Sequence, residues 1–156
     1  MRKKKNKLTI KISSIIVFVA GLILSIVFTT MFRLVRIEGD SMYPTLQHGC
    51  RIIVRQRGFE LAANDIVVLQ TEDGFAIKRV IALPNDSVTL KDNEVIVNGI
   101  RISPYAYYGE EPVSFELTDT QYFVIGDNYQ ISYDSRDYGP ISIDQIIGKY
   151  LFTLAP

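Results

Sequence analysis

The sequence is poor in cysteine and histidine, with Cys50 and His48 as the single residue of each kind. One cysteine cannot form an intrachain disulfide, so a folded domain of this chain must be held together by its core. One histidine and one cysteine also cannot supply the ligands of a zinc site. We therefore expect no bound metal.

Acidic side chains are absent from the first eleven residues, which carry six cations. The rest of the chain holds 17 acidic and 11 basic residues, a net charge of −6. Phosphate contacts need clustered Lys and Arg on the folded domain, so this acidic remainder argues against nucleic acid as a partner. Residues 1–11 form a basic tail instead.

Charge is also absent from residues 12–32, ISSIIVFVAGLILSIVFTTMF. An apolar run of this length predicts a transmembrane anchor in the lipid bilayer of the cell membrane. A cleaved secretory signal peptide is the alternative, but its apolar region is shorter and ends in small residues, whereas TTMFRLVRIEG is bulky there. Six cations precede the span and only Arg33 and Arg36 follow it closely. The positive-inside rule therefore places residues 1–11 in the cytoplasm and residues 33–156 outside it.

Helical periodicity is nearly absent from residues 33–156, and short strand-like runs recur instead. The runs are RLVRIEG, RIIVRQ, DIVVLQ, FAIKRVIAL, SVTLKD, EVIVNGIRI, QYFVIGD and GKYLFTL, separated by turn signals such as EDG, LPND and KDN. This pattern predicts a compact all-β domain, with a hairpin across Asn98-Gly99. Residues 103–119 contain two prolines and three closely spaced tyrosines. We expect them to form an irregular surface loop.

Ser41 lies in the unusual setting IEGDSMYPTL. Gly39 and Asp40 end the preceding strand, and Pro44 disfavours a helix after it, so we expect a tight turn that presents the serine. Ser41 follows Phe32 by nine residues, which keeps it within roughly 30 Å of the membrane even in an extended chain. An ordinary turn serine is the alternative interpretation. A nucleophilic serine needs a base to take its proton.

Histidine is the first candidate for that base. His48 follows Ser41 by seven residues, in the polar turn LQHGC. A Ser-His-Asp triad needs a histidine opposite the serine, and a lone histidine in such a turn is more often solvated. Pairing of His48 with Cys50 as a thiolate dyad is a further alternative, but a cysteine at the head of an apolar run is more often part of the core.

Lysine is the second candidate, and residues 33–156 contain three: Lys78, Lys91 and Lys149. Lys91 lies in the polar turn LKDNE. Lys78 lies inside FAIKRVIAL, where burial would lower its pKa toward the range of a general base, whereas the guanidinium of Arg79 cannot deprotonate. A Lys78 side chain that reaches solvent is the alternative. Lys149, in IIGKYLF, fits the same description, so local sequence does not choose between these two.

The segment VIGDNYQISYDSRDYG places a dense polar cluster directly after an apolar strand. Asp134 and Arg136 are two residues apart, which predicts a bidentate ion pair that holds the turn. Ser132 is placed to bond a nearby amine and orient it. A solvated polar loop is the alternative.

The blocks GDSMYPTL, NDIVVLQ, IKRVIALPND and VIGDNYQISYDSRDYG together resemble the ordered blocks of bacterial type I signal peptidases, peptidase family S26. The resemblance covers most of residues 35–148, includes the anchor, and is closest to the short form typical of Gram-positive bacteria. It implies a membrane-anchored serine endopeptidase with a β-rich fold whose edge strands bind extended substrate. The implied substrates are secretory preproteins with small residues at the third and first positions before the cut, and no cofactor is implied.

The same resemblance implies that Ser41 is the nucleophile and Lys78 the general base, by an acyl-enzyme mechanism. Gly39 stands where some longer family members have a hydroxyl donor, so we expect the oxyanion to rely on the backbone N–H of Ser41 and a neighbour. Asn85 replaces a glycine in the LPGD-like turn, which an asparagine that tolerates positive φ permits.

In the last block, Ser132 matches the serine that orients the lysine, and Asp134 and Arg136 match the pair that braces the site. Asp127 opens this block and is expected to be structural. Tyr129 stands where an arginine often follows GDN, which leaves the local bracing open.

Two rival classes remain. An inactive, membrane-tethered binding module would lack Ser41 or Lys78, and both are present. A peptidase of the same fold that cuts itself or one dedicated partner stays open, since fold and dyad do not determine substrate range.

Overall fold

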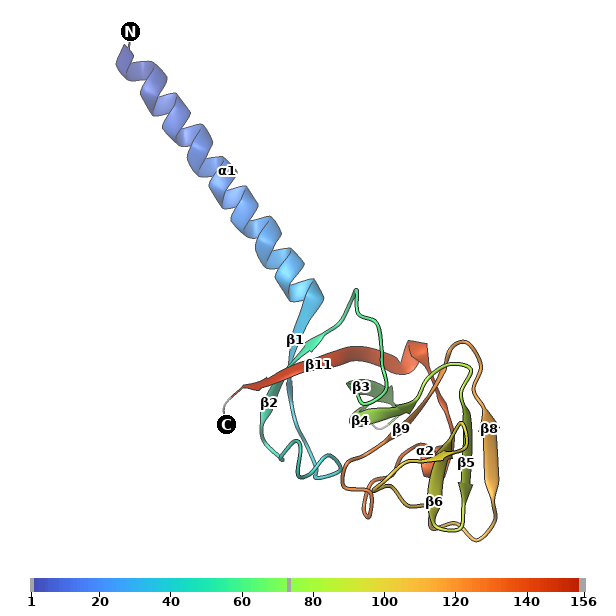
Figure 1. Ribbon diagram of the computed structural model, residues 1–156. Helices are drawn as coiled ribbons and strands as arrows, with labels where there is room; N and C mark the ends of the chain where they lie inside the picture. Colours follow the sequence, from blue (N-terminus) through green and yellow to red (C-terminus); the bar gives the residue numbers. More distant parts are fainter. Residues whose placement is uncertain (1, 73, 155–156) are drawn as a thin grey trace.

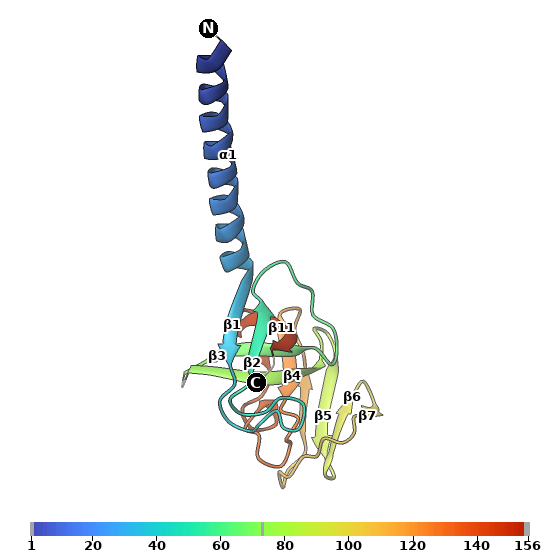
Figure 2. The ribbon, with the colours of Figure 1, turned by 90° about the vertical axis from the view of Figure 1, so that its left-hand side faces the viewer.

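The computed structural model describes residues 2–72 and 74–154, and it begins with one long helix, α1 (Arg2–Met31). Figures 1 and 2 show α1 projecting away from the β-sheets. Ser13–Met31 is long and apolar enough to cross a membrane, and none of it is buried against the rest of the chain. The predicted span 12–32 ends one residue beyond the end of α1. Phe32 instead begins the first strand, where it pairs with Arg55.

Two antiparallel sheets follow, which confirms the predicted all-β domain. The larger sheet has the order β1 (Phe32–Arg36), β2 (Arg51–Arg55), β11 (Ile146–Leu154), β3 (Ile66–Thr71), β4 (Gly74–Ala82), β9 (Gln121–Ile125) and β10 (Ile141–Ser142). The smaller sheet has the order β7 (Ile100–Arg101), β6 (Glu94–Val97), β5 (Ser87–Lys91) and β8 (Val113–Glu116). Two short helical turns, α2 (Ser135–Tyr138) and η1 (Ile143–Gln145), lie between β9 and β11.

The hairpin across Asn98-Gly99 is present, and it joins β6 to β7. Both turn residues have positive φ, as a two-residue turn of this hand requires. The loop predicted over residues 103–119 is wrong in one part, because β8 forms within it and pairs with β5. Val113 and Phe115 are partly buried while the residues between and after them are exposed, a two-residue alternation that drives strand formation.

The segment between β1 and β2 is anchored in the core of the larger sheet. Ile37, Met42 and Leu46 are 2–3% exposed and belong to one apolar cluster. Cys50 is partly buried and packs against this cluster, as expected of a core cysteine. The turn that carries Ser41 is therefore held from below by buried side chains.

Candidate active site

Ser41 begins a turn five residues after the end of β1, as the sequence predicted. Gly39 precedes it with φ of +83°, a left-handed conformation that favours glycine, and residues 41–45 form successive turns. Met42, which follows, is only 2% exposed, whereas Ser41 itself is half-buried. The turn thus anchors one side chain in the core and leaves the serine hydroxyl at the surface of a cleft.

His48 contributes to the shape of this turn rather than to a triad. Its Nδ1 accepts a hydrogen bond from the Gly39 N–H at 3.0 Å, and its side chain is exposed. Among the described residues, no hydrogen bond joins His48 to Ser41 or to Cys50. Its position explains how the backbone two residues before the serine is held in place.

Lys78 is buried, with 4% of its surface exposed, so the alternative of a side chain that reaches solvent is wrong. Its Nζ donates a hydrogen bond to Ser132 Oγ at 2.8 Å. Burial lowers the Lys78 pKa below its usual 10.5, an effect that the nearby Asp134 carboxylate partly opposes and Arg136 reinforces. This lysine is therefore easier to deprotonate than a solvated one.

The other two lysines have ordinary surroundings. Lys149 is about a quarter exposed, pairs with Asp65 at 2.6 Å and donates to the Glu60 carbonyl at 3.1 Å. Lys91 is exposed at the end of β5. Neither lysine shares the buried position of Lys78, so tertiary structure separates two candidates that local sequence left equal.

The segment after β9 joins Lys78 to the Ser41 turn. The Asn128 backbone N–H donates to the Ser41 carbonyl at 2.9 Å, and its side-chain amide donates to the Asp40 carbonyl at 3.1 Å. The Ser132 N–H in turn donates to the Asn128 carbonyl at 3.0 Å. No hydrogen bond joins Lys78 directly to Ser41 in residues 2–72 and 74–154, and such contacts often tighten only when substrate binds.

Gly126 shows how close these groups lie. A Cβ at this position would come within 2.2 Å of Ser132 Oγ and 2.6 Å of the Ser41 carbonyl oxygen. Real Cβ atoms essentially never come this close to other atoms. A glycine is therefore required at position 126, where Ser132 approaches the turn that carries Ser41. The sequence-based reasoning did not single out this residue, although the VIGDN segment contains it.

The predicted ion pair between Asp134 and Arg136 is present and bidentate, at 2.8 and 2.9 Å. Asp134 is fully buried, caps α2, and also accepts from the Gly126 N–H at 3.0 Å. Arg136 donates to the Ala106 and Tyr129 carbonyls at 2.7 and 2.8 Å. The pair therefore ties three segments together around the Lys78 side chain.

Asp127 pairs with Arg79, a contact that sequence reasoning missed. Two hydrogen bonds of 2.7 and 2.5 Å join the groups, and Arg79 also donates to the Asn64 carbonyl at 2.7 Å. The adjacency of Arg79 to Lys78 was the available signal, since neighbouring strand residues point to opposite faces. This pair braces β4 from the other face.

The structure also accommodates Asn85 and Tyr129, two residues that depart from the pattern the sequence resembles. Asn85 has φ of +68°, as expected of an asparagine that replaces a glycine. Tyr129 packs edge-on against Tyr105, with ring centroids 6.5 Å apart, and its carbonyl accepts from Arg136. Its backbone thus takes part in the bracing that the sequence left open.

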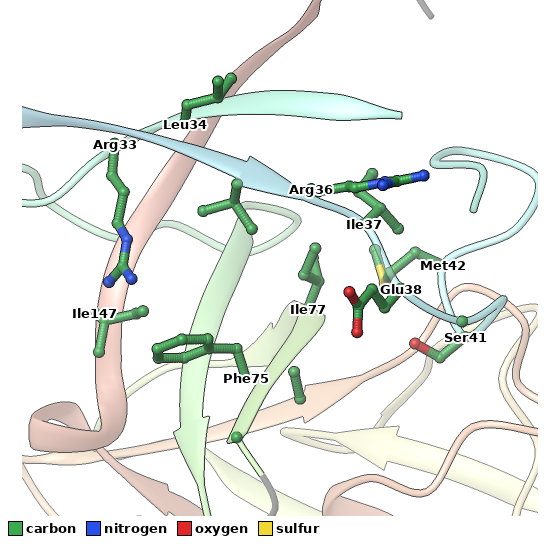
Figure 3. A pocket seen from close by; sticks show the side chains of 14 residues that line it. Arg33, Leu34, Arg36, Ile37, Glu38, Ser41, Met42, Phe75, Ile77 and Ile147 are labelled. Carbon is green, nitrogen blue, oxygen red and sulfur yellow. The ribbon is translucent and has the colours of Figure 1, made fainter. Parts of the chain in front are cut away.

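A cleft of about 610 Å³ leads along β1 to Ser41. Figure 3 shows the Ser41 hydroxyl at one end and Arg33 at the other. β1 is the edge strand of its sheet, and β9 pairs with β4 only from Arg79 to Ala82. β1 and the part of β4 before Arg79 therefore each offer an edge of unpaired backbone groups in the cleft. It is lined by Arg33, Leu34, Val35, Arg36, Ile37, Glu38, Gly39, Ser41, Met42, Gly74, Phe75, Ala76, Ile77 and Ile147.

Known proteins with similar sequences point to one family. Residues 9–155 match the family described as "Signal peptidase, peptidase S26". Signal peptidase I S of Bacillus subtilis is 33% identical over 77% of this chain and 75% of its own length. Signal peptidase IB of Staphylococcus aureus is 30% identical over 96% of this chain and 87% of its own length. A crystal structure of a signal peptidase I from Enterococcus faecalis aligns with a TM-score of 0.49 and 21% identity, covering 62% of this chain and all of that one.

The antiparallel sheets, the serine at the end of a cleft and the apolar helix before them define a membrane-anchored serine peptidase. The chain belongs to the signal peptidase family, peptidase S26. It is accordingly a hydrolase that removes signal peptides.

Proposed function

We propose that this protein cleaves secretory preproteins with Ser41 as nucleophile and Lys78 as general base. The observation that carries the proposal is the buried Lys78, whose Nζ bonds Ser132 beside the Ser41 turn and whose pKa is lowered by burial. A neutral amine at this place has a free lone pair, which a general base needs. A solvated lysine would be protonated at neutral pH.

In the first step, Lys78 Nζ takes the proton of Ser41 Oγ as this oxygen bonds to the carbonyl carbon before the cut. The tetrahedral intermediate then collapses, the peptide C–N bond breaks, and Lys78 returns the proton to the leaving amine. Lys78 then takes a proton from water as the water oxygen bonds to the acyl carbon; the ester C–O bond breaks, and Lys78 returns the proton to Ser41 Oγ. The backbone N–H of Ser41 makes no hydrogen bond within the described chain, which supports its role as a donor to the oxyanion.

Four residues would position this dyad without touching the substrate. Ser132 orients the lysine through its 2.8 Å hydrogen bond. Asp134 and Arg136 hold the segment that carries Ser132. Asp127 holds β4, which carries Lys78, through Arg79.

The proposed substrate lies extended in the cleft and completes the unpaired edges of β1 and β4 with backbone hydrogen bonds. Alternate side chains of such a peptide point to the same wall. Near Ser41 that wall consists of Ile37, Met42 and Ile77, which fill the space with branched or long side chains. This supports small residues at the third and first positions before the cut.

The proposed location is the cell membrane, with the basic tail in the cytoplasm and residues 33–156 outside. β1 begins directly after α1, so the cleft starts close to the bilayer. A substrate held in the same bilayer by its apolar segment can then reach Ser41 without leaving the membrane.

The test is a panel of unrelated preproteins incubated with the purified full chain in detergent, with Ser41→Ala as the matched inactive control. We expect cleavage of several preproteins after small residues, and none with Ser41→Ala. Cleavage of one partner alone, or self-cleavage alone, would contradict a general signal peptidase. Activity of Ser41→Ala equal to wild type would remove the nucleophile assignment.

A further inference from the structure

At the end of the cleft far from Ser41, Arg33 on β1 contacts Phe75 on β4. The guanidinium carbon of Arg33 lies 5.0 Å from the centre of the Phe75 ring, within the range of a cation–π interaction. Figure 3 shows the Arg33 side chain reaching from β1 toward Phe75. Phe75 is 53% exposed, so this contact faces the space that a bound peptide would enter.

The spacing along β1 relates this contact to the cut. Side chains of alternate strand residues share a face and are about 6.6 Å apart. Arg33, Val35 and Ile37 therefore occupy one face, with Ile37 nearest Ser41 (Figure 3). A peptide aligned with β1 presents its own alternate residues at the same interval. If its first residue before the cut lies at Ile37, its third lies at Val35 and its fifth at Arg33.

The direction of the peptide follows from the anchor. α1 leads into β1 (Figure 1), and β1 runs from Arg33 toward the turn that carries Ser41 (Figure 3). A preprotein whose apolar segment stays in the bilayer enters from the same end. Its chain therefore runs parallel to β1, and the residues before the cut lie between the helix end and Ser41.

Arg33 carries a charge that its surroundings leave available. Within residues 2–72 and 74–154, no carboxylate forms an ion pair with it, and the aromatic ring holds the planar guanidinium across the cleft. A guanidinium retains its donors for a carboxylate while one face stacks on a ring.

We propose that Arg33, held by Phe75, forms a subsite for the fifth residue before the cut, and that this subsite favours an acidic side chain over a basic one. The inference rests on the proposed function, because it takes Ser41 as the point of attack. It adds a charge preference that small pockets near the serine do not provide.

The experiment uses the full chain in neutral detergent micelles and two preproteins that differ only in Asp or Lys at the fifth position. We expect wild type to cleave the Asp form with about fivefold higher kcat/KM, the scale of a partly exposed ion pair. Arg33→Glu should reverse this preference, and Phe75→Ala should reduce it. Arg51→Glu is the matched control, since Arg51 is an exposed arginine on β2 that does not line this cleft, and it should leave the preference unchanged.

Three outcomes would overturn the subsite. Equal cleavage of the two substrates by wild type is one, and an unchanged preference in Arg33→Glu is another. The third is an equal loss for both substrates in Arg33→Glu that appears only with anionic lipid vesicles, which would make Arg33 a lipid headgroup contact. Failure of wild type to cleave either preprotein would instead contradict the proposed function itself.

Discussion

Lys78 Nζ donates a 2.8 Å hydrogen bond to Ser132 Oγ across 54 residues of sequence. This contact links the middle of β4 to the segment that also holds the Ser41 turn. It brings the buried Lys78 amine and the half-buried Ser41 hydroxyl into one region, although these two residues lie in separate segments of the sequence.

Replacement of Lys78 by arginine tests the base. Arginine keeps the charge and approximate length but does not deprotonate near neutral pH, so Lys78→Arg should lose at least about 100-fold in kcat/KM, the scale of general base catalysis. Lys149→Arg is the control, because arginine can keep the ion pair with Asp65. Cleavage by Lys78→Arg at the wild-type rate, with Lys149→Arg inactive, would show that the wrong lysine was chosen.

The pH dependence of kcat/KM follows from the lowered Lys78 pKa. Below that pKa the amine is protonated and cannot accept the serine proton, and above it the amine is neutral. Activity should therefore rise with pH and reach half its maximum below 10.5, the usual lysine value. A rate that falls as pH rises through this window would contradict a lysine base.

Gly126→Ala tests the close approach of the Ser132 side chain to the Ser41 turn. The added Cβ would meet Ser132 Oγ at 2.2 Å and the Ser41 carbonyl at 2.6 Å, so one of them must move. Displacement by about 1 Å costs on the order of 100-fold in rate. Gly21→Ala is the control, since nothing lies within 4 Å of its new Cβ. Full activity in a folded Gly126→Ala protein would show that this packing is not needed.

Arg136→Ala should destabilise the fold, because it leaves the fully buried Asp134 carboxylate without its partner. Loss of one member of a buried ion pair costs about 3–5 kcal/mol of unfolding free energy. The matched control is Arg101→Ala, whose ion pair with Glu94 is largely exposed and contributes about 1 kcal/mol or less. Denaturant unfolding measures both, and equal effects of the two variants would refute the proposed brace.

Protease added outside intact spheroplasts tests the orientation. Residues 33–156 should be degraded, while the basic tail of residues 1–11 should be protected until the membrane is permeabilised. An antibody tag on each end reports both parts of the chain. Protection of the β-domain in intact spheroplasts would reverse the proposed topology.

Much of the fold is predictable from local sequence. The two-residue alternation of apolar side chains places most strands, and the Asn98-Gly99 pair places the hairpin, because strand and turn preferences act over a few residues. β8 was missed because its four residues lie inside a segment rich in proline and tyrosine. α2 was missed for a different reason, since its four residues depend on the Asp134 cap.

The candidate active site likewise combines features that local sequence predicts with features that depend on tertiary contacts. By itself the sequence determined a serine on a turn, an acidic and basic pair two residues apart, and an apolar anchor, since each depends on neighbours in the chain. Only the tertiary structure decided that Lys78 is buried while Lys149 forms a partly exposed ion pair. The pKa of a lysine depends on the desolvation and charge around its amine, and the charged groups near Lys78, Asp134 and Arg136, are distant from it in the sequence.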